Sequence, residues 1–132
     1  MQFMKKAIFI ISILMLPFTI QAQTFVCTDI NFYGSDMTPQ KIQKEKTKYL
    51  GSKATLTFFD KSLKFSYTTN GKTESIVMDK VNANEYQAIE KRGNDTNKLV
   101  LKLNTWVEYI RSFTLEFYKN YSLGATITYK RD

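Results

Sequence analysis

The feature that most constrains the fold is an alternation of apolar and polar residues, repeated in segments joined by short turns. A tight turn at Asp60-Lys61 would align the segment 54–59 with the segment 62–67 and place the apolar residues of both on one face. The pairs that this turn predicts are Phe58 with Leu63, Leu56 with Phe65, and Ala54 with Tyr67. A shift of one residue would turn this whole apolar set to the other face, so the agreement between the segments predicts an antiparallel hairpin.

Asn70-Gly71 is the strongest turn signal in the chain, because a two-residue hairpin turn of this type needs positive φ at both central positions. A turn there adds a third strand whose apolar residues stay on the same face. The predicted pairs are Phe65 with Ile76 and Leu63 with Met78, and the polar exception on that face is Glu74, opposite Tyr67.

The C-terminal part of the chain repeats the alternation. A tight loop around residues 119–121 predicts the pairs Phe117 with Leu123, Leu115 with Ala125, and Phe113 with Ile127. Two further strands are expected at 85–91 and 98–104, joined by a polar turn at 92–97, and the second of them carries Leu99, Leu101 and Leu103 on one face. A first strand is expected at 25–33, with Val26, Ile30 and Phe32 on one side.

The fold class predicted from these segments is all-β. About eight short antiparallel strands follow one another in sequence, which indicates an up-and-down meander. A sheet with one apolar face throughout must bury that face, so we expect a closed or partly open barrel, with a β-sandwich as the alternative.

Residues 37–49 fit this pattern least well. The segment holds Pro39 and four lysines, Lys41, Lys44, Lys46 and Lys48. It is compatible with a basic loop, with an edge strand that lysines protect from pairing with other chains, or with a single helical turn.

The first 22 residues are typical of a secretory signal peptide. Lys5 and Lys6 precede an apolar run that ends near Ile20-Gln21-Ala22, where small Ala22 provides a cleavage site. The run is too short to span a hydrocarbon core, which needs about 20 apolar residues. We therefore expect a cleaved leader, a single β-rich domain at residues 23–132 without a transmembrane segment, and a periplasmic or secreted location.

The residue types that are absent limit the chemistry. The chain has no histidine, which excludes His-dependent catalytic triads and His-ligated zinc. Its single cysteine, Cys27, excludes an intramolecular disulfide and is expected to be a buried strand residue. Carboxylates remain as catalytic candidates, but their spacing selects no pair, so we expect no enzyme, no metal and no cofactor.

Candidate contact residues fall in two parts of the sequence. Trp106, the only tryptophan, lies near Tyr109 and Arg111 at the junction of two strands. Such a grouping is typical of binding hot spots, and it is also compatible with a plug at the end of a barrel. The second part is the set of lysines from Lys41 to Lys48, which would suit an anionic partner.

These observations favour an exported, non-catalytic binding or structural module that contacts an envelope or extracellular macromolecule, with nucleic acid excluded as a partner by the exported location. The first alternative is a carrier of a small hydrophobic ligand. An exported meander barrel resembles lipocalins in architecture, but residues 28–32 lack the Gly-x-Trp element of that family's first strand. The second alternative is a carboxylate-dependent hydrolase.

Overall fold

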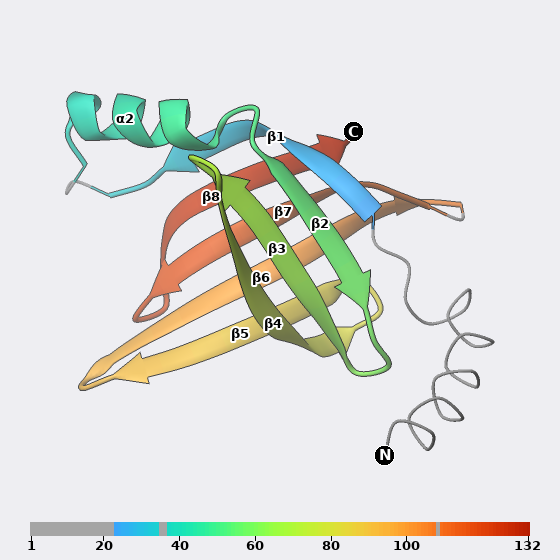
Figure 1. Ribbon diagram of the computed structural model, residues 1–132. Helices are drawn as coiled ribbons and strands as arrows, with labels where there is room; N and C mark the ends of the chain where they lie inside the picture. Colours follow the sequence, from blue (N-terminus) through green and yellow to red (C-terminus); the bar gives the residue numbers. More distant parts are fainter. Residues whose placement is uncertain (1–22, 35–36, 108) are drawn as a thin grey trace, which may run out of the picture.

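The protein is a closed eight-stranded antiparallel barrel with one helix (Figure 1). The computed structural model describes residues 23–34, 37–107 and 109–132, so the expected signal peptide at 1–22 lies outside it. The elements are β1 (Gln23–Phe32), α2 (Pro39–Tyr49), β2 (Lys53–Phe58), β3 (Ser62–Thr69), β4 (Lys72–Asn82), β5 (Glu85–Arg92), β6 (Asp95–Trp106), β7 (Tyr109–Lys119) and β8 (Ser122–Arg131). Each strand pairs with the next and β8 pairs with β1, which confirms the meander barrel rather than the sandwich.

The sheet formed by β2, β3 and β4 has the predicted register. All three pairs expected between β2 and β3 are present, and so are both pairs expected between β3 and β4. Asn70 and Gly71 have φ angles of 52° and 76°, as the hairpin turn requires. Glu74 lies opposite Tyr67, whose hydroxyl donates a 2.8 Å hydrogen bond to the Glu74 carboxylate.

The register between β7 and β8 differs from the prediction by two residues. Phe117 pairs with Ala125 rather than with Leu123, and the pairs Leu115 with Ile127 and Phe113 with Tyr129 follow from it. The turn is shorter than expected, with Asn120 and Tyr121 at φ 49° and 69°, and an irregularity at Phe117/Tyr118 leaves Gly124 as an extra residue in β8. A shift of two residues preserves the face of each side chain, so the apolar lining was still predicted correctly.

A bulge also changes the face of β1. The register shifts between Cys27 and Asp29, so the buried side chains are Phe25, Cys27 and Ile30. The expectation that Val26 shares a side with Ile30 and Phe32 is therefore wrong, because the extra residue reverses the alternation. The turn between β5 and β6 is also tighter than residues 92–97: Arg92 pairs with Asp95, and Gly93-Asn94 form the turn.

Residues 39–49 form the helix α2 rather than a loop, an edge strand or a single turn. Thr38 is the N-cap, and its hydroxyl accepts a 3.2 Å hydrogen bond from the Lys41 amide. Pro39 begins the helix, and it is tolerated there because an N–H at this position makes no hydrogen bond within the helix. The helix lies outside the barrel, and its last residue, Tyr49, packs against the core near Tyr67 (Figure 1).

The barrel interior is filled with aromatic side chains. The Phe113 ring lies 4.8 Å from that of Tyr129 and 5.0 Å from that of Phe25, and all three residues are buried. Phe65 makes further edge contacts with Phe113 and Tyr129. A cavity of about 70 Å³ remains beside this cluster, so the core consists of packed side chains and encloses little space.

Candidate functional site

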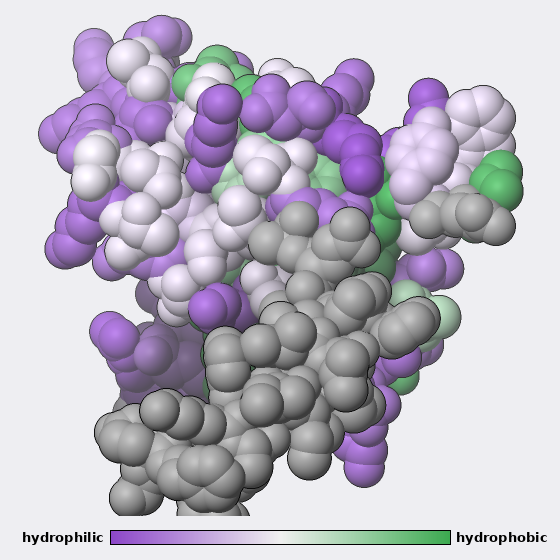
Figure 2. Space-filling view, turned by 45° about the vertical axis from the view of Figure 1, so that its right-hand side comes forward, coloured by the Kyte–Doolittle hydropathy of each residue, from purple (hydrophilic) through white to green (hydrophobic). Residues whose placement is uncertain are grey.

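The turn between β6 and β7 holds two exposed aromatic residues. Trp106 and Tyr109 pair across it, with 55% and 43% of their surfaces exposed. Val107 follows Trp106 at φ 55°, in the left-handed region that tight hairpin turns use. In Figure 2 this turn projects at the upper right. Trp106 lies outside the core cluster, so it does not plug the barrel.

Two arginines pack on these aromatic rings. The guanidinium carbon of Arg111 lies 5.0 Å from the Trp106 ring, and that of Arg131 lies 5.5 Å from the Tyr109 ring. Arg111 occupies this position because it is the extra residue in β7, where Asn104 pairs with Ser112 and Thr105 pairs with Ile110. These cation–π contacts hold flat rings and charged groups side by side.

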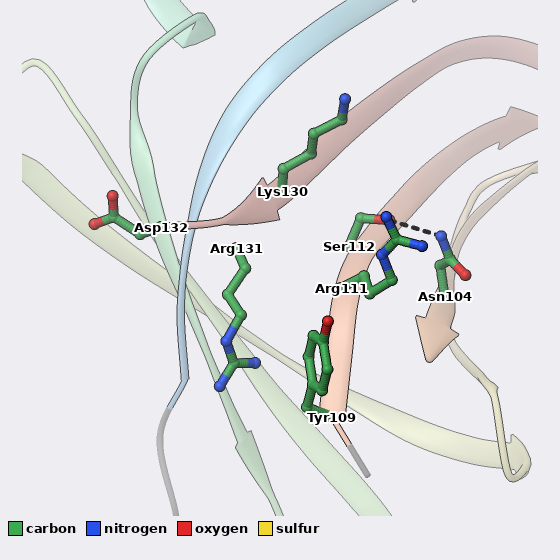
Figure 3. Close-up of a pocket in the computed structure, with 7 residues that line it drawn as sticks. All are labelled: Asn104, Tyr109, Arg111, Ser112, Lys130, Arg131 and Asp132. Atoms are coloured by element: carbon green, nitrogen blue, oxygen red, sulfur yellow. Dashed lines mark hydrogen bonds between the residues drawn. The ribbon is translucent and has the colours of Figure 1, made fainter. Parts of the chain in front are cut away.

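A groove of about 600 Å³ lies beside this turn, between the start of β7 and the end of β8. Pairing of these strands reaches as far as Ser112 and Lys130, and the residues beyond this pair diverge (Figure 3). The lining residues are Asn104, Tyr109, Arg111, Ser112, Lys130, Arg131 and Asp132. We call this opening the cationic groove.

Hydrogen bonds fix part of the cationic groove. Asn104 Nδ2 donates to Ser112 Oγ at 3.2 Å, the bond drawn in Figure 3. Arg131 Nη1 donates to the carbonyl of Ile110 at 3.0 Å and to Gln23 Oε1 at 2.9 Å. The Arg131 guanidinium thereby joins β8 to β7 and β1 at the end of the barrel.

Positive charge dominates the lining of this groove. Arg111, Lys130 and Arg131 contribute three cations, whereas Asp132 contributes one carboxylate side chain. Lys53 Nζ lies 3.2 Å from Asp132 Oδ2 and offsets that charge. The groove therefore suits an anionic group, because guanidinium groups bind carboxylates, sulfates and phosphates through paired N–H donors.

The predicted contact residues fall into two separate groups in the structure. Trp106, Tyr109 and Arg111 come together, as predicted from their spacing. Lys41, Lys44, Lys46 and Lys48 lie on α2, which joins β1 to β2, and successive connections of a meander alternate between the two ends of a barrel. The β1–β2 and β6–β7 connections are therefore at opposite ends, as Figure 1 shows, so the lysines do not extend the site at Trp106.

Four residues that line the cationic groove were not predicted from the sequence: Lys130, Arg131, Asn104 and Ser112. The register expected for β7 and β8 was wrong by two residues, which hid the pairing of Lys130 with Ser112. The cluster Tyr129-Lys130-Arg131 at the end of an alternating strand is the signal that could have indicated charge at this edge.

Other reactive side chains are already satisfied or buried. Cys27 is buried, and desolvation raises the pKa of its thiol. On the outer face, Glu116 accepts a hydrogen bond from the Tyr118 hydroxyl and lies 3.2 Å from Lys102 Nζ, which raises the pKa of both Tyr118 and Lys102. Among the residues that the structure describes, no group of three or more Cys, Asp or Glu could hold a metal ion.

No protein-family model matches this chain, and no curated protein matches its sequence. In residues 23–34, 37–107 and 109–132, no helix has both the length and the apolar character needed to cross a membrane.

Proposed function

We propose that this protein is an exported, non-catalytic binding module that holds an anionic extracellular or envelope polymer in the cationic groove. The observation that carries the proposal is that Arg111, Lys130 and Arg131 line one opening together with the exposed ring of Tyr109, and that Arg111 packs on the exposed ring of Trp106 beside it. The exported location rests on the signal-peptide pattern of residues 1–22.

The chemistry of the groove favours a polymer that carries acidic groups on a flat, partly apolar backbone, such as an acidic polysaccharide. Arginine and lysine bind the acidic groups, and the aromatic rings offer apolar faces that a polymer can cover. Tryptophan, tyrosine and arginine are the residues that most often dominate binding energy at interfaces. Their exposure here leaves them accessible to a large partner.

Two observations favour this function over the alternatives. Most glycoside hydrolases use a pair of carboxylates, whereas the groove is lined by one acidic side chain, Asp132, which pairs with Lys53. A barrel that carries a ligand wholly inside its interior needs an interior pocket of about 300–1,000 Å³. The cavity inside this barrel measures about 70 Å³.

The test compares two double variants in binding to dextran sulfate, with uncharged dextran as the reference polymer. The variant Arg111→Gln/Lys130→Gln removes two cations of the groove. The control Lys41→Gln/Lys44→Gln removes two from the far end of the barrel. We expect the first to weaken binding about tenfold, equivalent to about 1.4 kcal/mol, and the second to change it little.

Equal weakening by both variants would show that net charge alone attracts the polymer, and it would overturn the proposal. Failure of the unmodified protein to prefer dextran sulfate over dextran would overturn it as well. Circular dichroism and thermal unfolding of each variant establish that the barrel is intact, which is expected because all four residues are exposed.

A further inference from the structure

The strands β4 and β5 separate over much of their length. Their pairs are Asp79 with Gln87, Lys80 with Tyr86, and Asn82 with Glu85. Within the described residues, 72–78 of β4 pair with β3 alone and 88–92 of β5 pair with β6 alone. Figure 1 shows the two strands diverging from their shared turn, so the barrel wall has a seam at this point.

An apolar groove of about 550 Å³ lies along this seam. Ala88, Leu99 and Phe117 pair across three strands and form a row on its wall, and Ile76 faces them from β4. Phe117 is 38% exposed although its side chain is on the inner face, whereas Phe113 on the same face of β7 is fully buried. We call this opening the seam groove.

The seam groove continues into the barrel. Ile76, Leu99 and Phe117 line both the groove and the interior cavity of about 70 Å³. The cavity ends against aromatic side chains that include Tyr49 and Tyr129. The inner end of a ligand lying in the groove would therefore meet aromatic side chains of the barrel interior.

The outer end of the groove carries cations. Lys98 and Lys119 line it together with Glu90; Lys119 is on the inner face with Leu99 and Phe117, and Lys98 is on the outer face with Tyr118. Arg92 Nε lies 2.9 Å from Glu90 Oε1 and offsets the charge of that carboxylate. In the part of the chain that the structure describes, neither lysine has an ion-pair partner. The positive charge at this outer end is therefore available to a ligand.

A comparison with the seam between β1 and β2 shows what is absent here. Those strands pair from Gln23 to Val26, and α2 lies over the part of β1 that follows, with Tyr49 packed against the core (Figure 1). No described element covers the seam groove in the same way. The protein thus supplies its own cover at one seam and leaves the other accessible.

We propose that the seam groove binds a single-chain anionic amphiphile such as a fatty acid, separately from the polymer held in the cationic groove. The acyl chain lies along Ala88, Leu99 and Phe117 with its end toward the interior cavity. The carboxylate lies at Lys119, which is on the same face of β7 as Phe117. A volume of about 550 Å³ is within the range of small-molecule sites, about 300–1,000 Å³.

The first test measures binding of decanoate, dodecanoate and tetradecanoate by calorimetry. Each added methylene is expected to strengthen binding by up to about fourfold while the groove has room. Ala88→Phe places a ring in the groove and should abolish binding. Gln87→Phe places the same ring on the adjacent residue of β5, whose side chain faces the opposite side, and should preserve binding.

A second pair of variants tests the charged end and does not depend on packing. Lys119→Gln should weaken dodecanoate binding several-fold and leave the binding of neutral dodecanol unchanged. Lys61→Gln, in the β2–β3 turn at the other end of the barrel, should change neither. Equal effects of Lys119→Gln on both ligands would contradict the assigned position of the carboxylate.

Trp106 fluorescence tests whether ligand binding in the seam groove is independent of the cationic groove. Trp106 lies at the opposite end of the barrel, so dodecanoate should leave its fluorescence and the affinity for dextran sulfate unchanged. Dodecanoate binding that survives Ala88→Phe, or that shows no dependence on chain length, would overturn the proposal. So would binding of an extended peptide at the seam, with protection of the amides of 72–78, in place of dodecanoate.

Discussion

The cationic groove and the seam groove arise from the same structural event but differ in chemistry. Each lies where two neighbouring strands stop pairing: β7 and β8 beyond Ser112 and Lys130, and β4 and β5 beyond Asp79 and Gln87. The first is lined by three cations and an exposed aromatic side chain, and the second has an apolar wall with Lys119 at its outer end.

The difference follows from which side chains the strands present at each opening. At the seam groove, Ala88, Leu99 and Phe117 pair in regular register from β5 through β6 to β7, so the inner, apolar face is uncovered. At the cationic groove, a bulge inserts Arg111, and the strand ends contribute Lys130 and Arg131. Where two strands separate, the side chains that the local register places at the opening become exposed. A single bulge is enough to change which side chains these are.

The largest expected effect is a difference in stability between truncating a ring of the core and truncating a ring of the seam groove. Phe113→Ala should lower the free energy of unfolding by about 3–5 kcal/mol, because it removes a fully buried ring. Phe117→Ala, four residues along the same strand, should cost clearly less, because Phe117 is 38% exposed in the seam groove. Urea unfolding measures both, and equal losses would mean that Phe117 is part of the core rather than of an opening.

Salt should affect the two grooves differently. Exposed charges are screened beyond about 10 Å at 0.1 M ionic strength and beyond about 3 Å at 1 M. Over that range we expect dextran sulfate binding to weaken by about tenfold or more, and binding of neutral dodecanol to the seam groove to stay within about twofold. Titrations at both salt concentrations measure the contrast. A similar loss for both ligands would remove the chemical distinction between the grooves.

The turn between β3 and β4 provides a smaller, local perturbation. Gly71 has φ 76°, so Gly71→Ala should lower the free energy of unfolding by about 1 kcal/mol through backbone strain. Gly124→Ala is the control, since its φ is not in the left-handed region and its added Cβ would lie 3.7 Å from the Phe117 carbonyl oxygen, an ordinary contact. Thermal unfolding compares them, and an equal or larger loss at Gly124 would contradict this explanation.

The smallest expected effect is a pH dependence near the seam groove. Burial and the hydrogen bond to Glu74 raise the pKa of Tyr67 to about 12, from an ordinary value near 10. The unfolded state releases this proton first, so the associated stability is complete below about pH 10 and is lost as the pH rises toward 12.

Between about pH 10 and 12, the free energy of unfolding should decrease less in Tyr67→Phe than in the unmodified protein. The difference should be below about 1 kcal/mol, because the Tyr67 hydroxyl is partly solvated. Stability measured across this range in both proteins checks the sign. Tyr121→Phe is the control, because Tyr121 is 88% exposed. A steeper decline in Tyr67→Phe would contradict the assigned direction.

Much of the fold could be predicted from alternation and turn chemistry, because both act between neighbouring residues. The pairs around Asn70-Gly71 were correct for this reason. The bulges in β1, β7 and β8 could not be predicted, since they depend on how whole strands bend to close the barrel. The helix α2 was missed because the spacing of its lysines concealed a Thr38-Pro39 start signal.

The candidate sites were less predictable than the fold. The spacing of Trp106, Tyr109 and Arg111 is local, and the sequence was sufficient to group them. The contribution of β8 to the cationic groove depends on a long-range register, and the seam groove depends on where pairing between β4 and β5 ends. The run Tyr129-Lys130-Arg131 indicates charge at the end of β8, but a short stretch of sequence shows neither the residues opposite it nor where strand pairing ends.

The most direct test of two chemically distinct openings is an amide chemical-shift map recorded by NMR with dextran sulfate and with dodecanoate. We expect the polymer to shift residues 104–112 and 130–132, dodecanoate to shift residues 76, 88–90, 97–99 and 117–119, and both ligands together to give the sum of the two sets. A single overlapping set of shifted residues, or displacement of one ligand by the other, would contradict it.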